Sequence, residues 1–412
     1  MSETLKPLPP EAQARFHWLH DRRVQKIVRA LTVLEANAVR FVGGCVRDSL
    51  LDRAPKDIDL ATTLTPPQVI EALLAAGLGA APTGIDHGTV TAIAEHFPIE
   101  VTTLRADVMT DGRRATVAFT KDWASDARRR DFTINALYVT PDLKIFDPVG
   151  GAADLARARV RFIGAAVDRI REDYLRILRF FRFSARYAKT IDADGLAACS
   201  ALRSGIMRLS AERIGDELTK ILALDSAARA LSAMNEAAIL AEIWPAAPEI
   251  GTLARLKEIA PAAPAPLGLA ALWGERGEGI DARLRLSNAD GRRRRRAVER
   301  APAISETMPD QAIRALVYRF GADGFEDALL LARARAPGRG AFGGHATIAA
   351  KFTPPPLPFS GNDVIAGGVA EGPRVAAVLS AAEARWIDED FPAPDRAREI
   401  LSEEVARAIS TG

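Results

Sequence analysis

The sequence predicts an α+β fold, in which a small mixed β-sheet with flanking helices fills the first third and helices form the remainder. Short apolar runs with β-branched residues, bounded by glycine and proline, gather before about residue 149. From about Ala152 onward, alanine and leucine recur at spacings of three and four residues, and strand patterns nearly vanish. A chain of 412 residues has room for roughly two to four domains.

The elements of the first third are predicted from these patterns in chain order. A helical stretch from Glu11 to Ala36 comes first, and a strand over Val39–Val42 then ends in the tight turn Gly43-Gly44. The next expected elements are a helix over Val46–Leu51, a strand over Ile58–Leu60, a helix from Thr65 through Ala76, and strands over Thr89–Ala94 and Ile99–Leu104.

Prolines divide the helical remainder into parts. Pro245 and Pro248 interrupt it first, and the segment Pro261–Pro266 follows. The run Thr353–Pro358 contains four prolines and predicts a stiff linker before a final small helical unit.

Charge is nearly balanced over the whole chain but clustered locally. The formal net charge is +2, with 26% charged and 48% hydrophobic residues, which are the proportions of an ordinary soluble protein. Arginines gather at 128–130, at 283 and 285, and in the run 292–296 followed by Arg300. Such clusters favour a local phosphate-binding track, and a solvated helix face is the alternative for any one of them.

Two cysteines, Cys45 and Cys199, exclude a disulfide framework and a four-cysteine zinc site. The first residues lack the pattern of a signal peptide, and the longest apolar run, Ala72–Ala81, is too short to span a bilayer. We therefore expect a cytoplasmic protein.

The chemistry concentrates in the segment from Phe41 to Leu60. Asp57 and Asp59 stand two residues apart and, on a strand, would project to one face. Paired carboxylates of this kind suit two Mg²⁺ ions that serve an in-line phosphoryl displacement. Gly43 and Gly44 leave the backbone open to a triphosphate, and Arg47 adds a charged donor. An edge strand with surface aspartates is the alternative, but it does not explain the glycines and the arginine in the same unit.

The motif GGCVRDSLLDRAPKDIDL resembles the signature of the class II tRNA nucleotidyltransferase and bacterial poly(A) polymerase family. Further motifs of this family follow in order over roughly residues 38–222, at 129–137, 146–155, 172–183 and 210–214. The resemblance implies a nucleotidyltransferase head at residues 1–149, a helical, nucleotide-selecting neck at 150–225, a helical RNA-binding body at 226–352 and a helical tail at 353–412.

The resemblance also implies roles for residues of the head. Asp57 and Asp59 would bind the metals, and Gly44 and Arg47 would contact the nucleoside triphosphate, with Gly43 in the same turn. Within the motif Arg129–Leu137, Arg130 would serve the phosphates, Asp131 would meet the ribose 2′-hydroxyl, and Asn135 would belong to the nucleotide site. Glu100 is the candidate for a third catalytic carboxylate, and an ordinary exposed glutamate on a strand is the alternative.

Asp173 and Arg176 are the candidates for base selection. The segment Glu172–Arg176 predicts a helix, on which residues three apart share a face. Cytosine and adenine both present an amino donor beside a ring-nitrogen acceptor, and an Asp–Arg pair complements that order. In the resembled family this segment has that role. An intrahelical salt bridge is the competing interpretation. Arg179 and Arg182 continue the three-residue spacing toward the phosphates or sugar.

The predicted function is the addition of C, C and A to a tRNA 3′ end. CTP and ATP would be the substrates, without a nucleic-acid template, by two-metal transfer that releases pyrophosphate. The segment Gly84–Val90, the polar loop from Asp107 to Asp126 and the segment Pro358–Trp386 resemble enzymes that add CCA. Arg292, Arg293, Arg294, Arg295 and Arg296 are the candidate RNA-binding residues.

Poly(A) polymerase activity is the first alternative, because both activities use the same head. A non-catalytic RNA-binding relative is the second, and the presence of both Asp57 and Asp59 argues against it. Nucleotidyl transfer to a small hydroxyl compound is disfavoured by the long helical remainder with its clustered arginines, which suits a polyanionic partner. The oligomeric state is left open.

Overall fold

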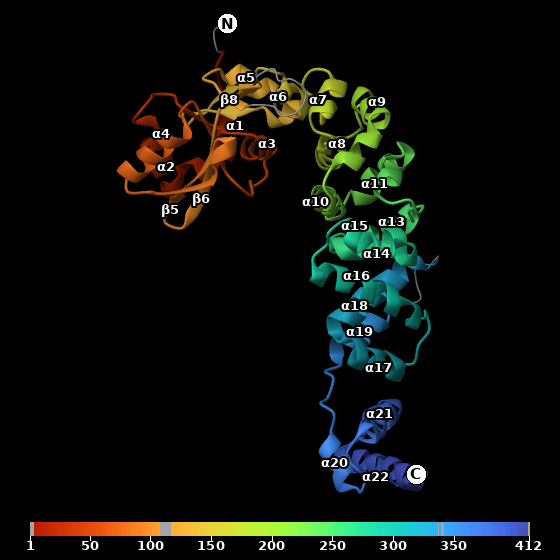
Figure 1. Ribbon diagram of the computed structural model, residues 1–412. Helices are drawn as coiled ribbons and strands as arrows, with labels where there is room; N and C mark the ends of the chain where they lie inside the picture. Colours follow the sequence, from red (N-terminus) through yellow and green to blue (C-terminus); the bar gives the residue numbers. More distant parts are fainter. Residues whose placement is uncertain (1–3, 108–116, 337, 339–341, 411–412) are drawn as a thin grey trace. The chain divides into compact units, whose positions relative to one another are not determined.

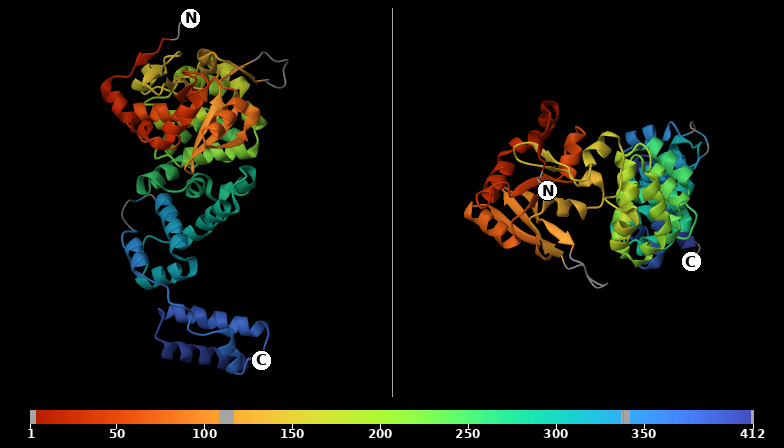
Figure 2. Two further views of the ribbon diagram at one scale, coloured as in Figure 1. Left: turned by 90° about the vertical axis from the view of Figure 1, so that its left-hand side faces the viewer. Right: turned by 90° about the horizontal axis from the view of Figure 1, so that it is seen from above.

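The computed structural model describes residues 4–107, 117–336, 338 and 342–410. The chain divides into two units, one formed by Met1–Glu217 with Ala233–Ile243 and the other by Leu218–Ser232 with Trp244–Gly412. The predicted boundaries of head, neck, body and tail stay a prediction. Figures 1 and 2 show strands in the N-terminal part, red to yellow, and helices in the green-to-blue remainder, which confirms the α+β class.

An eight-stranded mixed sheet forms the centre of the N-terminal part, in the order β1-β10-β9-β2-β3-β6-β5-β4. Its strands are β1 (Lys6–Pro7), β2 (Val39–Val42), β3 (Asp59–Thr62), β4 (Gly79–Gly84), β5 (Thr89–Ala94), β6 (Phe97–Thr103), β9 (Tyr138–Val139) and β10 (Lys144–Phe146). A separate two-stranded sheet pairs β7 (Arg105–Asp107) with β8 (Val117–Phe119). The predicted strands at 39–42 and 89–94 have the predicted bounds.

The only parallel pair among the described strands of this sheet joins β3 to β6, and its register sets Asp59 opposite Glu100. All other neighbouring strands run antiparallel, and β2 lies on the other side of β3. Asp59 and Glu100, which are distant in sequence, therefore lie side by side on adjacent strands.

The helices of this part flank the sheet. They are α1 (Pro10–Gln13), the 3-10 helix η1 (Ala14–His20), α2 (Arg22–Thr32), α3 (Gly44–Leu50), α4 (Pro66–Ala75), η2 (Ile85–His87), α5 (Trp123–Arg128), η3 (Thr133–Asn135) and α6 (Gly151–Ala156). Helices α2 and α4 pack on each other and on β5. Their buried apolar residues, such as Ile27 and Leu73, form part of the core.

The predicted helical stretch from Glu11 to Ala36 is divided into α1, η1 and α2, and it ends at Thr32. Phe16 has non-helical backbone angles, and Asp21 begins α2 as its N-cap by accepting a hydrogen bond from the Arg23 amide. The side chain of Asp21 therefore separates η1 from α2, as N-cap residues do.

The part of the chain predicted as the neck contains α7 (Ala166–Glu172), α8 (Leu175–Tyr187) and α9 (Ala193–Ala201). The prediction of one helix through Glu172–Arg176 is wrong, because Asp173 is extended, with φ −153° and ψ 107°. Its Oδ1 accepts a hydrogen bond from the Leu175 amide at 3.1 Å, at the start of α8. Asp173 and Arg176 thus lie at a junction of two helices.

The remaining elements are helical throughout the described residues. They are η4 (Arg203–Arg208), α10 (Ala211–Leu222), α11 (Ala227–Glu236), α12 (Ile239–Ile243), α13 (Ile250–Ile259), α14 (Ala265–Trp273), η5 (Gly274–Gly277), α15 (Ile280–Arg283), α16 (Asn288–Arg300), η6 (Ala301–Ala303), α17 (Asp310–Phe320), α18 (Ala322–Arg335), α19 (His345–Lys351), α20 (Gly361–Ala366), α21 (Pro373–Asp388) and α22 (Pro394–Ser410). None of the helices in the described part of the chain has the length and apolarity needed to cross a bilayer.

The final three helices, which follow Thr353–Pro358, have a core of their own. Val364, Trp386 and Ile400 are among its buried side chains. Tyr318 of α17 packs against this core and donates a hydrogen bond from its hydroxyl to Glu383 at 2.9 Å.

Candidate functional site

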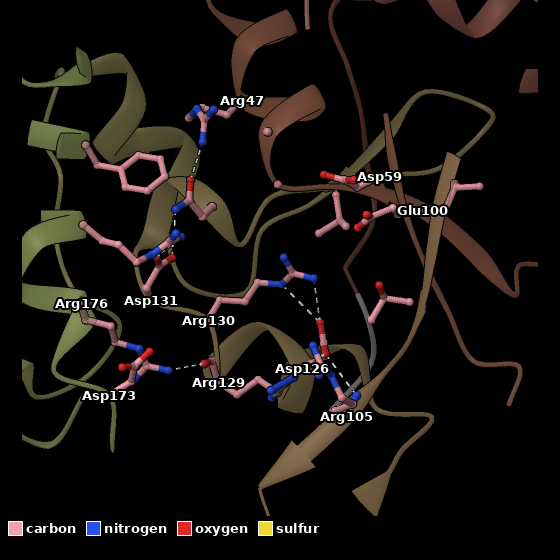
Figure 3. A pocket seen from close by; sticks show the side chains of 18 residues that line it. Arg47, Asp59, Glu100, Arg105, Asp126, Arg129, Arg130, Asp131, Asp173 and Arg176 are labelled. Carbon is pink, nitrogen blue, oxygen red and sulfur yellow. Dashed lines mark hydrogen bonds and ion pairs between the residues drawn. The ribbon is translucent and has the colours of Figure 1, made fainter. Parts of the chain in front are cut away.

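A polar pocket of about 520 Å³ lies between the central strands β3 and β6 and the start of α8. Figure 3 shows Asp59 and Glu100 on one side, Asp173 and Arg176 on the opposite side, and Arg129 and Arg130 between them. The lining residues are Val42, Gly43, Gly44, Arg47, Asp59, Leu60, Glu100, Thr102, Arg105, Asp126, Arg129, Arg130, Asp131, Asn135, Asp173, Arg176, Arg179 and Phe183.

The acidic side of the pocket consists of Asp59 and Glu100. Burial of Asp59, together with the negative charges of Glu100 and Asp57, raises the pKa of the Asp59 carboxyl to about 6, although the Arg130 charge opposes the rise. Asp57 is exposed in the bend before β3 and is not a lining residue. The prediction that both aspartates lie on the strand is therefore wrong, because β3 begins at Asp59.

This carboxylate set fits a divalent cation that also binds a substrate. Among the residues that the structure describes, no three His, Cys, Asp or Glu side chains are gathered as a complete metal site. Mg²⁺ commonly uses one or two carboxylates and completes its coordination with phosphate oxygens and water. The repulsion between Asp59, Glu100 and Asp57 is the electrostatic environment that a cation would relieve.

The turn before α3 brings a bare backbone and Arg47 to the pocket. Gly43 has φ +70°, a conformation in which a side chain would be strained, so the turn requires glycine there. Arg47 is 7% exposed and donates from Nη1 to the Asn135 Oδ1 at 2.6 Å and from Nε to the Asp48 Oδ1 at 2.9 Å. The Arg47 guanidinium is therefore held in one position.

Arg130 is held by a buried pair of acceptors. Its Nε donates to the Tyr138 hydroxyl at 3.0 Å, and its Nη2 donates to Asp126 Oδ2 at 3.2 Å. Tyr138 in turn donates to the same carboxylate at 2.8 Å. Burial of Asp126 opposes its ionisation, but the Arg130 charge and the Tyr138 hydrogen bond together keep the pKa of this carboxyl below its usual value.

Asp131 and Arg179 join the loop after α5 to α8. Arg179 donates from Nε and Nη2 to Asp131 Oδ2, at 2.8 and 2.6 Å. Asp131 Oδ1 accepts from the Asn135 side chain at 2.9 Å and from the Phe132 amide at 2.8 Å. The carboxylate predicted to meet a ribose hydroxyl thus has partners on both oxygens.

Asp173 and Arg176 line the same pocket but do not pair with each other. Asp173 Oδ2 accepts from Arg213 Nη2 at 2.8 Å. Arg176 donates to Glu172 at 2.6 Å and to the Arg169 carbonyl at 2.8 Å. The competing interpretation of a salt bridge between them therefore does not hold, and each side chain is oriented by groups of its own.

Most of the residues predicted to bind metal or nucleotide are brought together, with two exceptions. Gly43, Gly44, Arg130, Asp131, Asn135 and Arg179 line the pocket as expected. Asp57 stands outside the lining, and Arg182 is turned away to an ion pair with the buried Glu217 at 2.5 Å.

Sequence reasoning missed Arg105, Asp126 and Phe183 as lining residues. Arg105 begins β7, separated from the end of β6 by one residue, and Phe183 lies four residues after Arg179 on α8, so their spacing is a usable signal. Asp126 is the last residue of the polar loop predicted over 107–126. The segment instead contains β8 and the first part of α5, and residues 108–116 lie outside the described residues.

The arginine run 292–296 on α16 is not a uniform basic track. Arg293 pairs with Asp327 at 2.6 Å, and both Arg294 and Arg295 bind Asp281. Arg294 is itself only 3% exposed. A second pocket in this unit is lined by Arg292, Arg293, Arg296 and Arg300 together with Phe320 and Gly321.

Two family models match the chain. Residues 39–161 match the poly A polymerase head domain, and residues 190–250 match the probable RNA and SrmB-binding site of polymerase A. The head match contains the β3–β6 pair, Arg47 and the Arg130–Asp131 segment, which together form most of the pocket.

Curated relatives and solved structures point the same way. The mitochondrial CCA tRNA nucleotidyltransferase 1 of Mus musculus is 44% identical over 229 residues, 54% of this chain and 51% of that protein. A CCA-adding enzyme of Oceanobacillus iheyensis is 45% identical over 195 residues, 46% of this chain and 48% of that protein. The chain thus spans about half the length of the curated relatives it matches.

The crystal structure of the Bacillus stearothermophilus CCA-adding enzyme in complex with CTP matches 98% of this chain and 100% of that one, with a TM-score of 0.74 and 25% identity. A Thermotoga maritima CCA-adding enzyme complexed with tRNA shares the fold, with a TM-score of 0.70 at 19% identity, over 98% of this chain. The whole helical remainder therefore has the architecture of these proteins.

Proposed function

We propose that the chain belongs to the family of class II tRNA nucleotidyltransferases and bacterial poly(A) polymerases and that it adds C, C and A to the 3′ end of tRNA. CTP and ATP are the substrates, and pyrophosphate is the product. One observation carries the proposal: Asp173 and Arg176 face one pocket with the carboxylates Asp59 and Glu100. A single cavity thus combines groups suited to choosing a base with groups suited to nucleotidyl transfer.

The base is chosen by hydrogen-bond polarity. An ionised Asp173 accepts from the amino group of cytosine or adenine, and Arg176 donates to the neighbouring ring nitrogen. Guanine and uracil present the reverse order at those two atoms. Since Arg213 and Glu172 hold the two side chains separately, the pair keeps its polarity without a nucleic-acid template.

The phosphates meet the basic groups of the pocket. Arg47 and Arg130 supply charged N–H donors, and the Gly43-Gly44 turn allows the triphosphate to approach the backbone closely. Arg47 and Arg130 are fixed by Asn135, Asp48, Asp126 and Tyr138, so little order is lost when the substrate binds.

Transfer joins the terminal 3′ oxygen of the RNA to the α-phosphorus as the bond to the pyrophosphate oxygen breaks. Asp59, with Asp57 beside it, would hold Mg²⁺, which supplies electrostatic stabilisation of the attacking and leaving oxygens when bound. Glu100, next to Asp59 in the register, is the group that takes the proton of the attacking hydroxyl. Arg130 and Arg47 balance the charge that gathers on the departing pyrophosphate.

The RNA acceptor is bound in part by the second pocket. Arg292 and Arg296 stand one turn apart on α16, are exposed and line this pocket, and neither forms an ion pair with another described residue, whereas Arg293 pairs with Asp327. We therefore reduce the predicted RNA-binding run to Arg292 and Arg296, supported by Arg300. A cytoplasmic location belongs to the same proposal, and it is supported by the buried free thiols Cys45 and Cys199.

Poly(A) addition is the second candidate, because the matching family model describes the head domain of poly A polymerase. Both activities need the same transfer chemistry. They differ in whether cytosine is accepted and in where addition stops.

The substitution Asp173→Asn tests the proposed base choice. The amide keeps an acceptor for the Leu175 amide but presents a donor on the other side, which complements the O4 of uracil or the O6 of guanine. The kcat/KM ratio of UTP or GTP to CTP or ATP should rise by about tenfold to hundredfold, since one bidentate contact contributes about 1–3 kcal/mol of discrimination.

Asp168→Asn is the matched control, because Asp168 is an exposed carboxylate of α7 that pairs with Arg171 at 3.9 Å and does not line the pocket. Its nucleotide ratios should equal those of the wild type. Unchanged ratios in Asp173→Asn as well would refute base selection by this pair.

A further inference from the structure

Tyr187 connects α8 to the phosphate-binding side of the pocket. It is the last residue of α8, and its hydroxyl donates to Asp48 Oδ1 on α3 at 2.9 Å. The same Oδ1 accepts from Arg47 Nε at 2.9 Å. One carboxylate oxygen therefore connects the end of α8 to the guanidinium that lines the pocket.

The ring of Tyr187 also contacts Arg47 directly. The centre of the Arg47 guanidinium lies 4.2 Å from the centroid of the Tyr187 ring and 5.4 Å from that of Phe183. Both aromatic rings are buried and stack on each other, with 22° between their planes. A guanidinium over an aromatic face is attracted to it and loses freedom to rotate.

These contacts leave one part of Arg47 directed at the glycine turn. Nε is taken by Asp48 and Nη1 by Asn135. Nη2 would lie 3.8 Å from a Cβ added at Gly44. Tyr187, Asp48 and Asn135 thus orient Arg47 so that Nη2 faces the backbone proposed to receive the triphosphate.

The opposite end of α8 is tied to the same network. Arg179 binds Asp131, Asp131 accepts from Asn135, and Asn135 accepts from Arg47. The path Asp48–Arg47–Asn135–Asp131–Arg179 therefore returns to α8, which carries Arg176 near its start. The phosphate donor and the base-selecting residue are fixed to one helix.

We propose that Tyr187 is a positioning residue for the nucleoside triphosphate, which sets Arg47 through Asp48 and through its own ring. This inference rests on the proposed function, because it assigns Arg47 to the phosphates. Its consequence is specific: the effect falls on phosphate affinity, which CTP and ATP share, and not on the choice between the bases.

Tyr187→Phe is the direct test, because it removes the hydroxyl and keeps the ring. The probe is inorganic tripolyphosphate, whose Kd for the full-length protein is measured by calorimetry. A charge-assisted hydrogen bond contributes enough for Kd to rise by about fivefold to tenfold. KM for CTP and for ATP should rise by the same factor, and the ratio of the two should stay at the wild-type value.

Two further variants separate positioning from general stability. Tyr318→Phe removes an equivalent hydroxyl–carboxylate bond, to Glu383 at 2.9 Å in the C-terminal unit, and should leave the Kd for tripolyphosphate unchanged. In an Arg47→Lys background, Tyr187→Phe should have no further effect on that Kd, because the hydroxyl acts through the guanidinium.

An unchanged Kd in Tyr187→Phe would overturn the inference, and so would a full additional loss in the Arg47→Lys background. A wild-type protein that binds tripolyphosphate but adds no nucleotide to RNA would instead refute the proposed function. The binding comparison would then still decide the role of Tyr187.

Discussion

Asp59→Asn should make the metal-free protein more stable near neutral pH while it abolishes nucleotide addition. Asp59 sits between β2 and β6 with Glu100 opposite it, and its folded-state pKa is about 6 against an ordinary value of 3.8. A raised carboxyl pKa means that ionisation opposes folding. The loss of unfolding free energy caused by ionising Asp59 is absent below the pKa of the unfolded chain. It grows as pH rises from about 4 to about 6 and reaches its full size above that.

The size of the effect follows from the shift. A rise of about two pKa units corresponds to almost 3 kcal/mol, and partial exposure of the side chain reduces this to about 2 kcal/mol. The isosteric amide carries no charge, so Asp59→Asn should gain about 2 kcal/mol at pH 7.5 and much less at pH 4.5. Bound Mg²⁺ should cancel most of this difference, because it stabilises the wild-type carboxylate alone.

Hydrogen–deuterium exchange is the suitable assay, because it reports the opening free energy of the sheet separately from the C-terminal unit. Amides of β3 and β6 should be better protected in Asp59→Asn than in the wild type at pH 7.5 with a chelator present. Asp126→Asn is the control, and it should reduce the protection of the sheet amides at pH 7.5. The reason is that Arg130 and Tyr138 lower the pKa of the Asp126 carboxyl in spite of its burial, so its ionised form stabilises the fold. A gain in Asp59→Asn that is equal at both pH values, or no gain at pH 7.5, would refute the electrostatic reasoning.

Three other outcomes are expected. Neutralising Arg292 and Arg296 together should weaken tRNA affinity and reduce the slope of log K against log salt by about 2. An unchanged slope would show that the two side chains do not contact the tRNA phosphates. Arg294→Gln should instead destabilise the C-terminal unit by about 2 kcal/mol in urea unfolding, because it removes the charged hydrogen bonds of a buried guanidinium to Asp281 while Arg295 still pairs with that carboxylate; a loss no larger than that of Arg296→Gln would contradict this. Asp57→Ala and Asp59→Ala should each stop nucleotide incorporation while tRNA binding in a filter assay stays near the wild-type value, and active variants would remove both from the metal site.

The parts of the fold that the sequence predicted are those determined by neighbours along the chain. The strand Val39–Val42 and its Gly43 turn, the proline-started helix α4 and the alternating strand β5 all carry local signals strong enough to fix their bounds. The break at Asp21 also had a local signal, an N-cap residue before an amphipathic stretch, which the long helical periodicity concealed.

The residues of the site could be predicted from the sequence, but the contacts between them could not. Motif order indicated Asp59, Arg47, Arg130, Asp131 and Arg176, and all of them line one pocket. Their partners come from residues distant in sequence, as when Tyr187 reaches Asp48 across 139 positions. Spacing along a helix could not reveal such contacts.

Arg182 illustrates the limit of spacing. It continues the series Arg176, Arg179, Arg182, yet Glu217 from α10 binds it away from the pocket. The same holds for the arginine run of α16, where three of the five arginines form ion pairs with Asp281 or Asp327. Competition from tertiary ion pairs decides which basic residues remain available to RNA.

The central claim is that one pocket selects C and A in turn and then stops. Full-length protein, Mg²⁺ and all four nucleoside triphosphates should therefore be incubated with a tRNA that lacks its last three nucleotides, and the 3′ ends of the products should be sequenced. Products that end in a single CCA, with UTP and GTP unused, are the expected result. Runs of A on the same substrate, or incorporation without regard to base, would contradict it.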